Sequence, residues 1–364
     1  MAIPVNYFPG VHTFQDALLP PERTDEAVDI GLLIPDNASL AANNGAELAI
    51  RIANENGGYK GSPFRLVVRS MEGPWGTGSK QAVDLIFEQE VWALMGSHDG
   101  RNAHLVEQAA TKTRIVFLSA WSSDPTLSQA FVPWFFSCIP NDMQQANALI
   151  EEIYGRRGFK NIGAVADKGY DSNLALKSFV NQTKAANKKE PLQFSYDNSE
   201  KDYNDVIDQL QHSGIDCIVL FGQPSSAIKL VQAIGLKRMN LPVFGTMSLL
   251  DENAISYPGL KNYEGIVLPS PGHWFIPKGS DFCAAYQKWY GSMPGAVAAY
   301  AFDGMNIILE AVRKAGLDRD QIIKTMGTTR HEGVTGIFQF DSKGNRTGTF
   351  GLMTIKNGIP VALK

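Results

Sequence analysis

The chain alternates short, nearly unbroken apolar runs with longer amphipathic stretches over most of its length. The apolar runs are rich in β-branched residues, which is typical of strands that are buried on both faces of a parallel sheet. The amphipathic stretches have the period of helices that cover such a sheet, and several end at a glycine. Strands are expected at residues 28–35, 64–70, 91–95, 115–119, 161–166, 193–195, 217–221, 243–244 and 265–268. Helices are expected at residues 45–56, 80–88, 100–111, 143–154, 172–186, 204–212 and 225–234.

These elements follow one another as βαβα in two rounds, which predicts an α/β fold with parallel sheets. A chain of 364 residues exceeds what one hydrophobic core usually supports, so we expect two doubly wound lobes. Residues 1–26 are rich in proline and lack periodicity, and we expect them to form an extended N-terminal arm. No apolar run approaches the roughly 18 residues that a membrane-spanning helix needs.

The charge balance changes this picture little, because 33 lysines and arginines face 37 aspartates and glutamates. A basic surface for nucleic acid or for an anionic membrane is therefore not expected. The opening residues MAIPVN lack the basic start and apolar core of a signal peptide, so either there is no export or the signal has been removed. The three cysteines form no CxxC pair and are expected to be buried thiols, which slightly favours the cytoplasm.

A glycine-rich segment, GPWGTGSK at residues 73–80, lies between a predicted strand and a predicted helix, as a phosphate-binding P-loop does. In a P-loop the lysine directly follows the last glycine, whereas Ser79 precedes Lys80 here, so nucleotide binding is not expected. GxSxG, HExxH and CxxC patterns are absent, and the six histidines are scattered. The sequence therefore predicts no catalytic residues, no metal site and no cofactor.

The loop GSHDGRN at residues 96–102 follows a strand and opens a helix. Free backbone N–H groups and the positive end of the helix dipole converge there, which favours an anion. Gly100 offers an amide and Arg101 a bidentate contact to a carboxylate; an arginine that faces solvent is the open alternative. The adjacent His98 and Asp99 have the chemistry of a proton-transfer pair, but neighbours in a turn rarely face each other, so a solvated turn is favoured.

Five segments then occur in a recognisable order: a strand at 28–35, ANENGG at 53–58, LMGS at 94–97, LSAWSSDPTL at 118–127 and ADKGYD at 166–171. Together they resemble the type I periplasmic binding proteins, in particular the branched-chain amino-acid-binding receptors of ABC transporters. The resemblance covers about residues 27–360. It implies a protein that binds a solute and hands it on, without chemical change.

The resemblance also implies that the chain crosses a three-strand hinge between the lobes. The crossings are expected near residues 137–141, 268–272 and 345–349. Lobe 1 would then hold residues 27–139 and 271–346, and lobe 2 residues 140–270 and 347–364.

In lobe 1, the resemblance implies that the loop after the strand at 115–119 meets the polar end of the ligand. Ser119 belongs to this loop, the backbone carbonyl of Trp121 and the hydroxyl of Ser123 would contact the ligand, and the amide of Gly100 would bind its carboxylate. Two alternatives stay open: Trp121 belongs to the core, and Ser123 caps a helix, a role that is compatible with ligand contact.

In lobe 2, the resemblance implies that the ring of Tyr170 closes over the ligand, unless it simply packs beside the hinge. Asp171 replaces a glycine of the family and brings a carboxylate near the cleft, while Gln223 and Thr246 end two strands. Met247 stands where amino-acid receptors carry a glutamate for the ligand ammonium, and a thioether cannot neutralise a cation. Asp171 or Asp99 would have to supply that charge, or the ligand lacks an ammonium.

The sequence thus predicts a solute-binding receptor of an ABC importer that traps a small polar, carboxylate-bearing metabolite, such as an amino acid or a related acid, by hinge closure. Its partners would be ABC permease subunits, and its place the periplasm or the extracellular space. The alternative is a cytoplasmic sensor of the same fold, which resembles the amide-responsive regulators and controls a partner protein.

Overall fold

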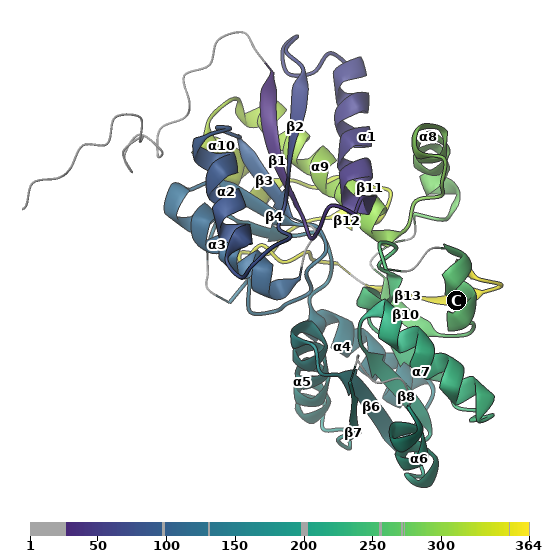
Figure 1. The fold of residues 1–364 in the computed structure, drawn as a ribbon. Coiled ribbons are helices and arrows are strands. Elements are labelled where there is room, and N and C mark those ends of the chain that lie inside the picture. The colour runs from purple at the N-terminus through teal and green to yellow at the C-terminus, as the bar shows by residue number, and fades with distance from the viewer. Residues whose placement is uncertain are drawn as a thin grey trace, which may run out of the picture.

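The structure is a computed structural model that describes residues 27–96, 99–129, 132–197, 203–254, 257–270, 272, 274–348 and 350–363. Two α/β lobes lie one above the other in Figure 1, each built around its own sheet. The predicted α/β class with two parallel-sheet lobes is confirmed. In the described ranges, no helix combines the length and the apolar character that crossing a membrane requires.

Lobe 1 is built on a parallel sheet with the strand order β2-β1-β3-β4-β5. Its strands are β1 Val28–Ile34, β2 Phe64–Ser70, β3 Ala93–Gly96, β4 Val116–Ser119 and β5 Phe135–Ser137. Its helices are α1 Ala41–Glu55, α2 Thr77–Phe87, α3 Gly100–Thr113, α8 Ser280–Tyr290, α9 Ala296–Ala315 and α10 Arg319–Thr328. All of β1 is buried, with Leu32 in one core and Leu33 in another, so helices cover both faces of this sheet.

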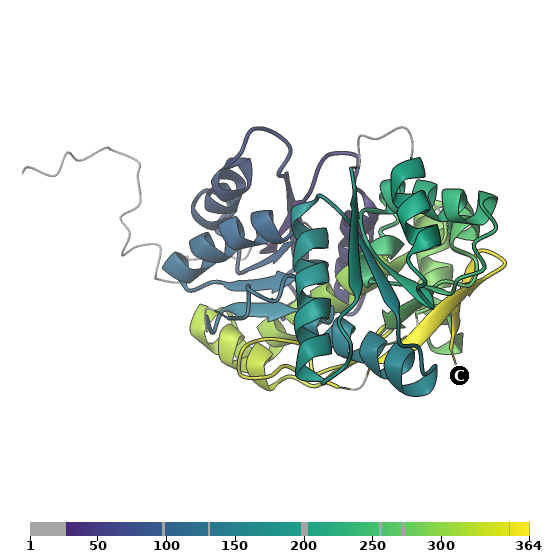
Figure 2. The same cartoon turned by 90° about the horizontal axis from the view of Figure 1, so that it is seen from below.

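Lobe 2 is built on a mixed sheet with the strand order β14-β13-β10-β9-β8-β6-β7. Its strands are β6 Ile162–Asp167, β7 Leu192–Tyr196, β8 Cys217–Phe221, β9 Val243–Gly245, β10 Val267–Ser270, β13 Gly351–Lys356 and β14 Ile359–Ala362. Its helices are α4 Asp142–Ile150, α5 Tyr170–Ala185, α6 Asn204–His212 and α7 Pro224–Leu236. Strands β13 and β14 pair antiparallel and form the edge of the sheet, where Figure 2 shows the chain ending.

Shorter elements complete the two lobes. The helix predicted at residues 143–154 is α4 followed by the π-helical turns η2 Glu151–Arg156. Three short 3₁₀ segments are η3 Met247–Leu250, η4 Tyr257–Tyr263 and η5 Pro277–Gly279, and a small hairpin pairs β11 His331–Gly333 with β12 Gly336–Phe338.

Helices α1 and α9 pack closely and hold the two distant parts of lobe 1 together. A Cβ atom at Gly45 would lie 2.2 Å from the carbonyl oxygen of Ala298, so only glycine allows this approach. Helix α9 is buried along most of its length, because it serves as the core of the lobe. The C-terminal part of the chain is therefore essential to the lobe that begins near residue 27.

The chain leaves the first sheet after β5, leaves the second after β10, and returns to the second at β13. The first and last of these connections are bonded to each other, since the N–H of Ser137 donates to the carbonyl of Gly344 at 2.9 Å. The amide of Gln144 also donates to the carbonyl of Arg346 at 2.8 Å. The lobe boundaries given above at the level of single residues remain a prediction.

Candidate functional site

A cavity of about 310 Å³, here called the inner cavity, lies between the two lobes. Its walls are loops and helix starts that follow strands, which is where open α/β sheets bind ligands. The lining residues are Pro35, Asp99, Trp121, Ser122, Ser123, Asp142, Asp171, Ser172, Ala175, Gly222, Gln223, Thr246, Ser248 and Asp251. Trp121 follows β4, Gln223 follows β8 and Thr246 follows β9, so both sheets contribute their carboxyl ends.

Local hydrogen bonds fix the hinge side of this cavity. Asn141 caps α4 and forms a reciprocal capping box with Gln144. The N–H of the next residue, Asp142, donates to the carbonyl of Ser123 at 2.8 Å, which joins the start of lobe 2 to the loop after β4 in lobe 1. The hydroxyl of Ser119 accepts the N–H of Ser122 at 3.2 Å and shapes the same loop from behind.

The inner cavity is acidic. Asp99, Asp142, Asp171 and Asp251 all line it, and its lining contains no lysine, arginine or histidine from the part of the chain that the structure describes. In that same part, no group of three histidine, cysteine or acidic residues is placed to hold a metal ion. Carboxylates in a cavity wall without basic side chains are matched by a cationic partner.

Asp142 is the most unusual of the four acids. The residue is 3% exposed, and neither carboxylate oxygen has a hydrogen-bond partner among the described residues. Burial raises the pKa of Asp142 well above its ordinary range; the nearby Ser123 hydroxyl opposes this effect, and the charges of Asp171 and Asp124 add to it. A buried acid without a partner is a costly arrangement, which a donor on a ligand would relieve.

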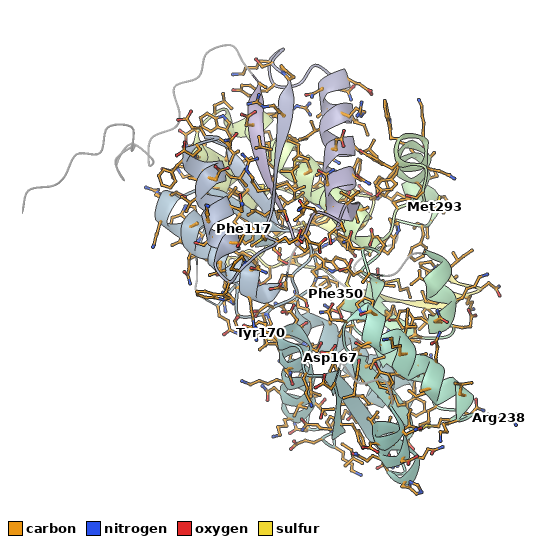
Figure 3. The ribbon with its side chains drawn as sticks, viewed as in Figure 1. Phe117, Asp167, Tyr170, Arg238, Met293 and Phe350 are labelled. Atoms are coloured by element: carbon orange, nitrogen blue, oxygen red, sulfur yellow. The ribbon has the colours of Figure 1, made fainter. Side chains whose placement is uncertain are left out.

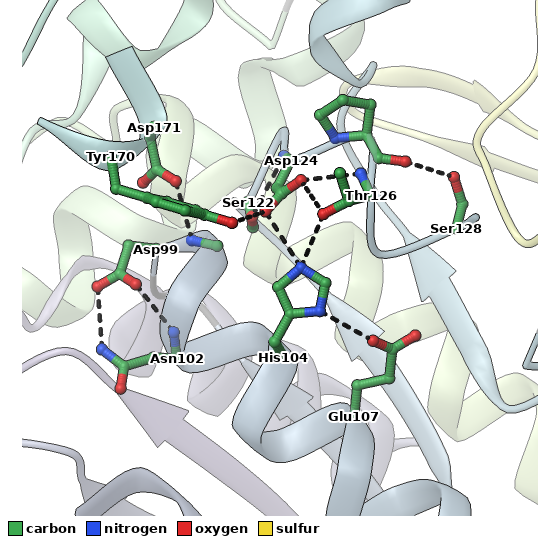
Figure 4. Close-up of polar contacts among 12 residues, drawn as sticks. Asp99, Asn102, His104, Glu107, Ser122, Asp124, Thr126, Ser128, Tyr170 and Asp171 are labelled. Atoms are coloured by element: carbon green, nitrogen blue, oxygen red, sulfur yellow. Dashed lines mark hydrogen bonds and ion pairs between the residues drawn. The ribbon is translucent and has the colours of Figure 1, made fainter. Parts of the chain in front are cut away.

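Beside the inner cavity, at a place here called the mouth, α5 contacts the start of α3 and the loop after β4 (Figure 4). The N–H of Gly100 donates to Asp171 at 3.2 Å, and the Tyr170 hydroxyl donates to Asp124 at 3.3 Å. Figure 3 places Tyr170 where the two lobes meet. Burial, followed by the charge of Asp99, raises the pKa of Asp171 to about 6, although the Gly100 amide opposes this.

This geometry changes the predicted role of the anion cradle. The Gly100 amide, expected to bind the ligand carboxylate, donates instead to a carboxylate from the other lobe. A Cβ at this position would lie 2.6 Å from Asp124 and 2.9 Å from Asp171, so the absence of a side chain permits the approach of the lobes.

A second cavity, of about 440 Å³ and here called the outer cavity, lies beside the first. It shares Asp99, Asp171 and Gln223 with the inner cavity. Its other lining residues are Met71, Gly73, Pro74, Trp75, Gly76, Arg101, Asn102, Leu105 and Tyr170. The guanidinium of Arg101 lies over the ring of Tyr170, 4.8 Å from its centre.

The structure brings together most of the residues that the sequence singles out. The inner cavity is lined by Asp99, Trp121, Ser123, Asp171, Gln223 and Thr246, while Arg101 and Tyr170 line the outer cavity only. Ser119 and Met247 are buried and line neither; the N–H of Met247 donates to the side-chain oxygen of Gln145 at 2.9 Å. His98 lies outside the described residues.

Two lining acids, Asp142 and Asp251, are absent from the predicted set. Asp142 directly follows Pro140 and the capping residue Asn141, at the predicted first crossing between the lobes. This location is the one sequence signal that could have pointed to Asp142 as a site residue. Asp251 follows η3, and the next two residues reach across to lobe 1. Glu252 accepts the N–H groups of Val297 and Ala298, and Asn253 accepts that of Ala41.

A charged cluster supports the mouth from the lobe 1 side. His104 Nε2 lies 3.3 Å from Asp124 Oδ2, and His104 Nδ1 lies 3.3 Å from Glu107. Hydrogen bonds with Asp124 and then Glu107 raise the pKa of His104 to about 9, against the effect of burial. Asp124 Oδ1 in turn accepts hydrogen bonds from the N–H and the hydroxyl of Thr126. These bonds fix the position of Asp124 opposite Tyr170.

Replacing His104 with glutamine is expected to destabilise the protein by about 1–2 kcal/mol at pH 6, a value reduced for the partial exposure of the ring. Because the folded-state pKa is raised, this stabilisation is fully present below about pH 6.5 and is lost as the pH rises through about 9. Urea unfolding of both proteins from pH 6 to 9.5 measures the difference. The exposed His212, replaced in the same way, is the control, and a difference that does not shrink with pH would contradict the assignment.

The chain matches a known protein family and is similar in fold to several solved structures. A family model described as periplasmic binding protein matches residues 27–358. The branched-chain amino acid transporter substrate-binding protein LivJ from Streptococcus pneumoniae, solved with isoleucine, is 20% identical with a TM-score of 0.81; the match covers 93% of this chain and 99% of that one. A substrate-binding protein from Desulfitobacterium hafniense, complexed with Leu, is 22% identical with a TM-score of 0.80, covering 93% and 100%.

Other similar proteins are more varied. A solute-binding protein from R. palustris, solved with benzoate, is 17% identical with a TM-score of 0.79, covering 93% of this chain and 95% of that one. Glutamate receptor 2.2 of Arabidopsis thaliana is 20% identical over 72% of this chain, which spans only 32% of the length of that receptor. These similarities concern the fold and not a particular ligand.

Proposed function

This chain belongs to the periplasmic binding protein family, and from that premise we propose that it is a solute-binding receptor of an ABC importer. It captures a small polar metabolite between its lobes, and the closed form is what the permease recognises. The observation that carries the proposal is the inner cavity, whose walls come from the strand ends of both lobes. Residues that contact one guest from both sides stabilise the closed arrangement alone.

The inner cavity also indicates the polarity of the guest. Its four aspartates, and above all the unpartnered Asp142, favour a ligand with an ammonium group. They supply the negative charge that Met247 cannot, since its side chain is buried away from the cavity. Together with the carboxylate that the family resemblance implies, this points to an amino acid or a related amino-bearing acid.

Binding is the whole activity in this proposal, and the ligand leaves chemically unchanged. The protein would act in the periplasm or the extracellular space, where such receptors meet their permeases. The alternative, a cytoplasmic sensor, draws no support from the relatives described above.

Native mass spectrometry of the purified protein tests the proposal, followed by calorimetry with the compound that it identifies. We expect a retained small metabolite, micromolar affinity corresponding to about 8 kcal/mol, and compaction of the protein in small-angle X-ray scattering when ligand is added. Turnover of the bound compound, or failure of any small solute to bind and compact the protein, would overturn it. If the protein binds a cytoplasmic partner in a ligand-dependent way and binds no permease, the sensor is favoured.

A further inference from the structure

The inner and outer cavities meet at Asp99, Asp171 and Gln223, which line both. They differ in charge. The inner cavity ends at the buried, unpartnered Asp142, whereas the outer cavity carries the guanidinium of Arg101. The cleft is thus divided into two adjoining compartments that share Asp99 and Asp171, and among the described residues only the outer one adds a cationic side chain.

Arg101 is suited to hold an anion. Its guanidinium lies on the face of Tyr170, and no carboxylate lies within 4.0 Å of it among the residues that the structure describes. Stacking on a ring leaves the N–H edge of an arginine free for a bidentate contact with a carboxylate. Trp75, which is 88% exposed, offers a further apolar surface in the same cavity.

The inner cavity is a poor place for a carboxylate. An anion there would lie among four aspartates, and the amide of Gly100, which the family resemblance assigns to a carboxylate, already donates to Asp171. In an α-amino acid the ammonium and the carboxylate are attached to the same carbon. Placing that ammonium beside Asp142 would therefore bring the carboxylate into the acidic compartment, where like charges repel it.

We propose that the ligand is an extended zwitterion whose ammonium lies in the inner cavity at Asp142 and whose carboxylate lies in the outer cavity at Arg101. The two charges are then separated by several bonds, as in an ω-amino acid or a short peptide. This inference rests on the proposed receptor function and specifies the class of its ligand. Arg101 becomes a specificity residue that selects for the distance between the two charges.

Isomeric probes test this inference directly. Calorimetry compares 6-aminohexanoate with 2-aminohexanoate, which have the same composition, and alanyl-alanine with its C-terminal amide. We expect the extended isomer to bind about tenfold or more tightly than the α-isomer, and the dipeptide to bind more tightly than its amide. Arg101→Gln should weaken the carboxylate-bearing extended probes by about tenfold and leave the dipeptide amide within about twofold.

The exposed Arg330, which lines neither cavity, is the matched control, and Arg330→Gln should bind every probe as the unchanged protein does. Equal or tighter binding of 2-aminohexanoate, or an Arg101→Gln protein with unchanged affinities, would overturn the inference. A retained ligand that lacks one of the two charges would overturn it as well, while the receptor function would stand. If no probe binds and no ligand is retained, both proposals fail.

Discussion

Replacing Arg346 with methionine is expected to lower the free energy of unfolding by about 3–5 kcal/mol. The side chain is fully buried, and its guanidinium donates to the backbone carbonyls of Cys138, Thr335 and Ile337. It also lies 3.6 Å from the centre of the Phe338 ring. Methionine keeps the apolar stem but leaves three backbone acceptors without these donors, two of them buried, and urea unfolding measures the loss.

The same change should affect the hinge, because Cys138 lies in the first connection between the lobes and Arg346 in the last. Arg346→Lys keeps the charge but has fewer directed donors, so an intermediate loss is expected. Arg330→Met, at an exposed position, should change the stability by no more than about 0.5 kcal/mol. A loss below about 1 kcal/mol in Arg346→Met would mean that the three carbonyls find other partners.

Strands with long apolar runs could be predicted from the sequence because burial on both faces leaves a continuous pattern. The strands at Phe64–Ser70 and Cys217–Phe221 coincide with their predicted limits. Strand β5 was not predicted, since three residues are too short for a pattern to stand out. Strand β14 was missed because an edge strand that includes Pro360 and exposes Ile359 does not look like a buried strand.

The site was predictable as a set of loops but not as a set of contacts. The carboxyl ends of parallel strands meet at one edge of each sheet, so Gln223 could be placed at the cleft as the end of a strand. Trp121 and Ser123 were placed there by the family resemblance. An aspartate in the first turn of a helix usually serves the helix dipole, so Asp142 looks ordinary in the sequence. Only the tertiary bond from its N–H to Ser123 brings it to the cavity.

Asp142→Asn is expected to weaken the binding of an amine-bearing ligand by about hundredfold, since it removes the charge from a dry contact. Burial raises the pKa of Asp142 well above its ordinary range in the free protein, and an ammonium beside it would favour the charged form and so lower that pKa. Binding should therefore release a proton, and affinity should rise with pH. Calorimetry in buffers of different ionisation enthalpy, at pH 8 to stay above the pKa of about 6 of Asp171, measures this release.

The substitution should also leave the protein as stable as before or more stable. A carboxyl group whose pKa is raised on folding destabilises the folded state above its unfolded pKa, and asparagine removes that penalty. Loss of binding together with unchanged or increased stability separates a ligand-binding acid from a structural one. Asp208→Asn, at an exposed position on α6, is the matched control and should change neither binding nor proton release. Retained affinity and undiminished proton release in Asp142→Asn would show that another acid anchors the ligand.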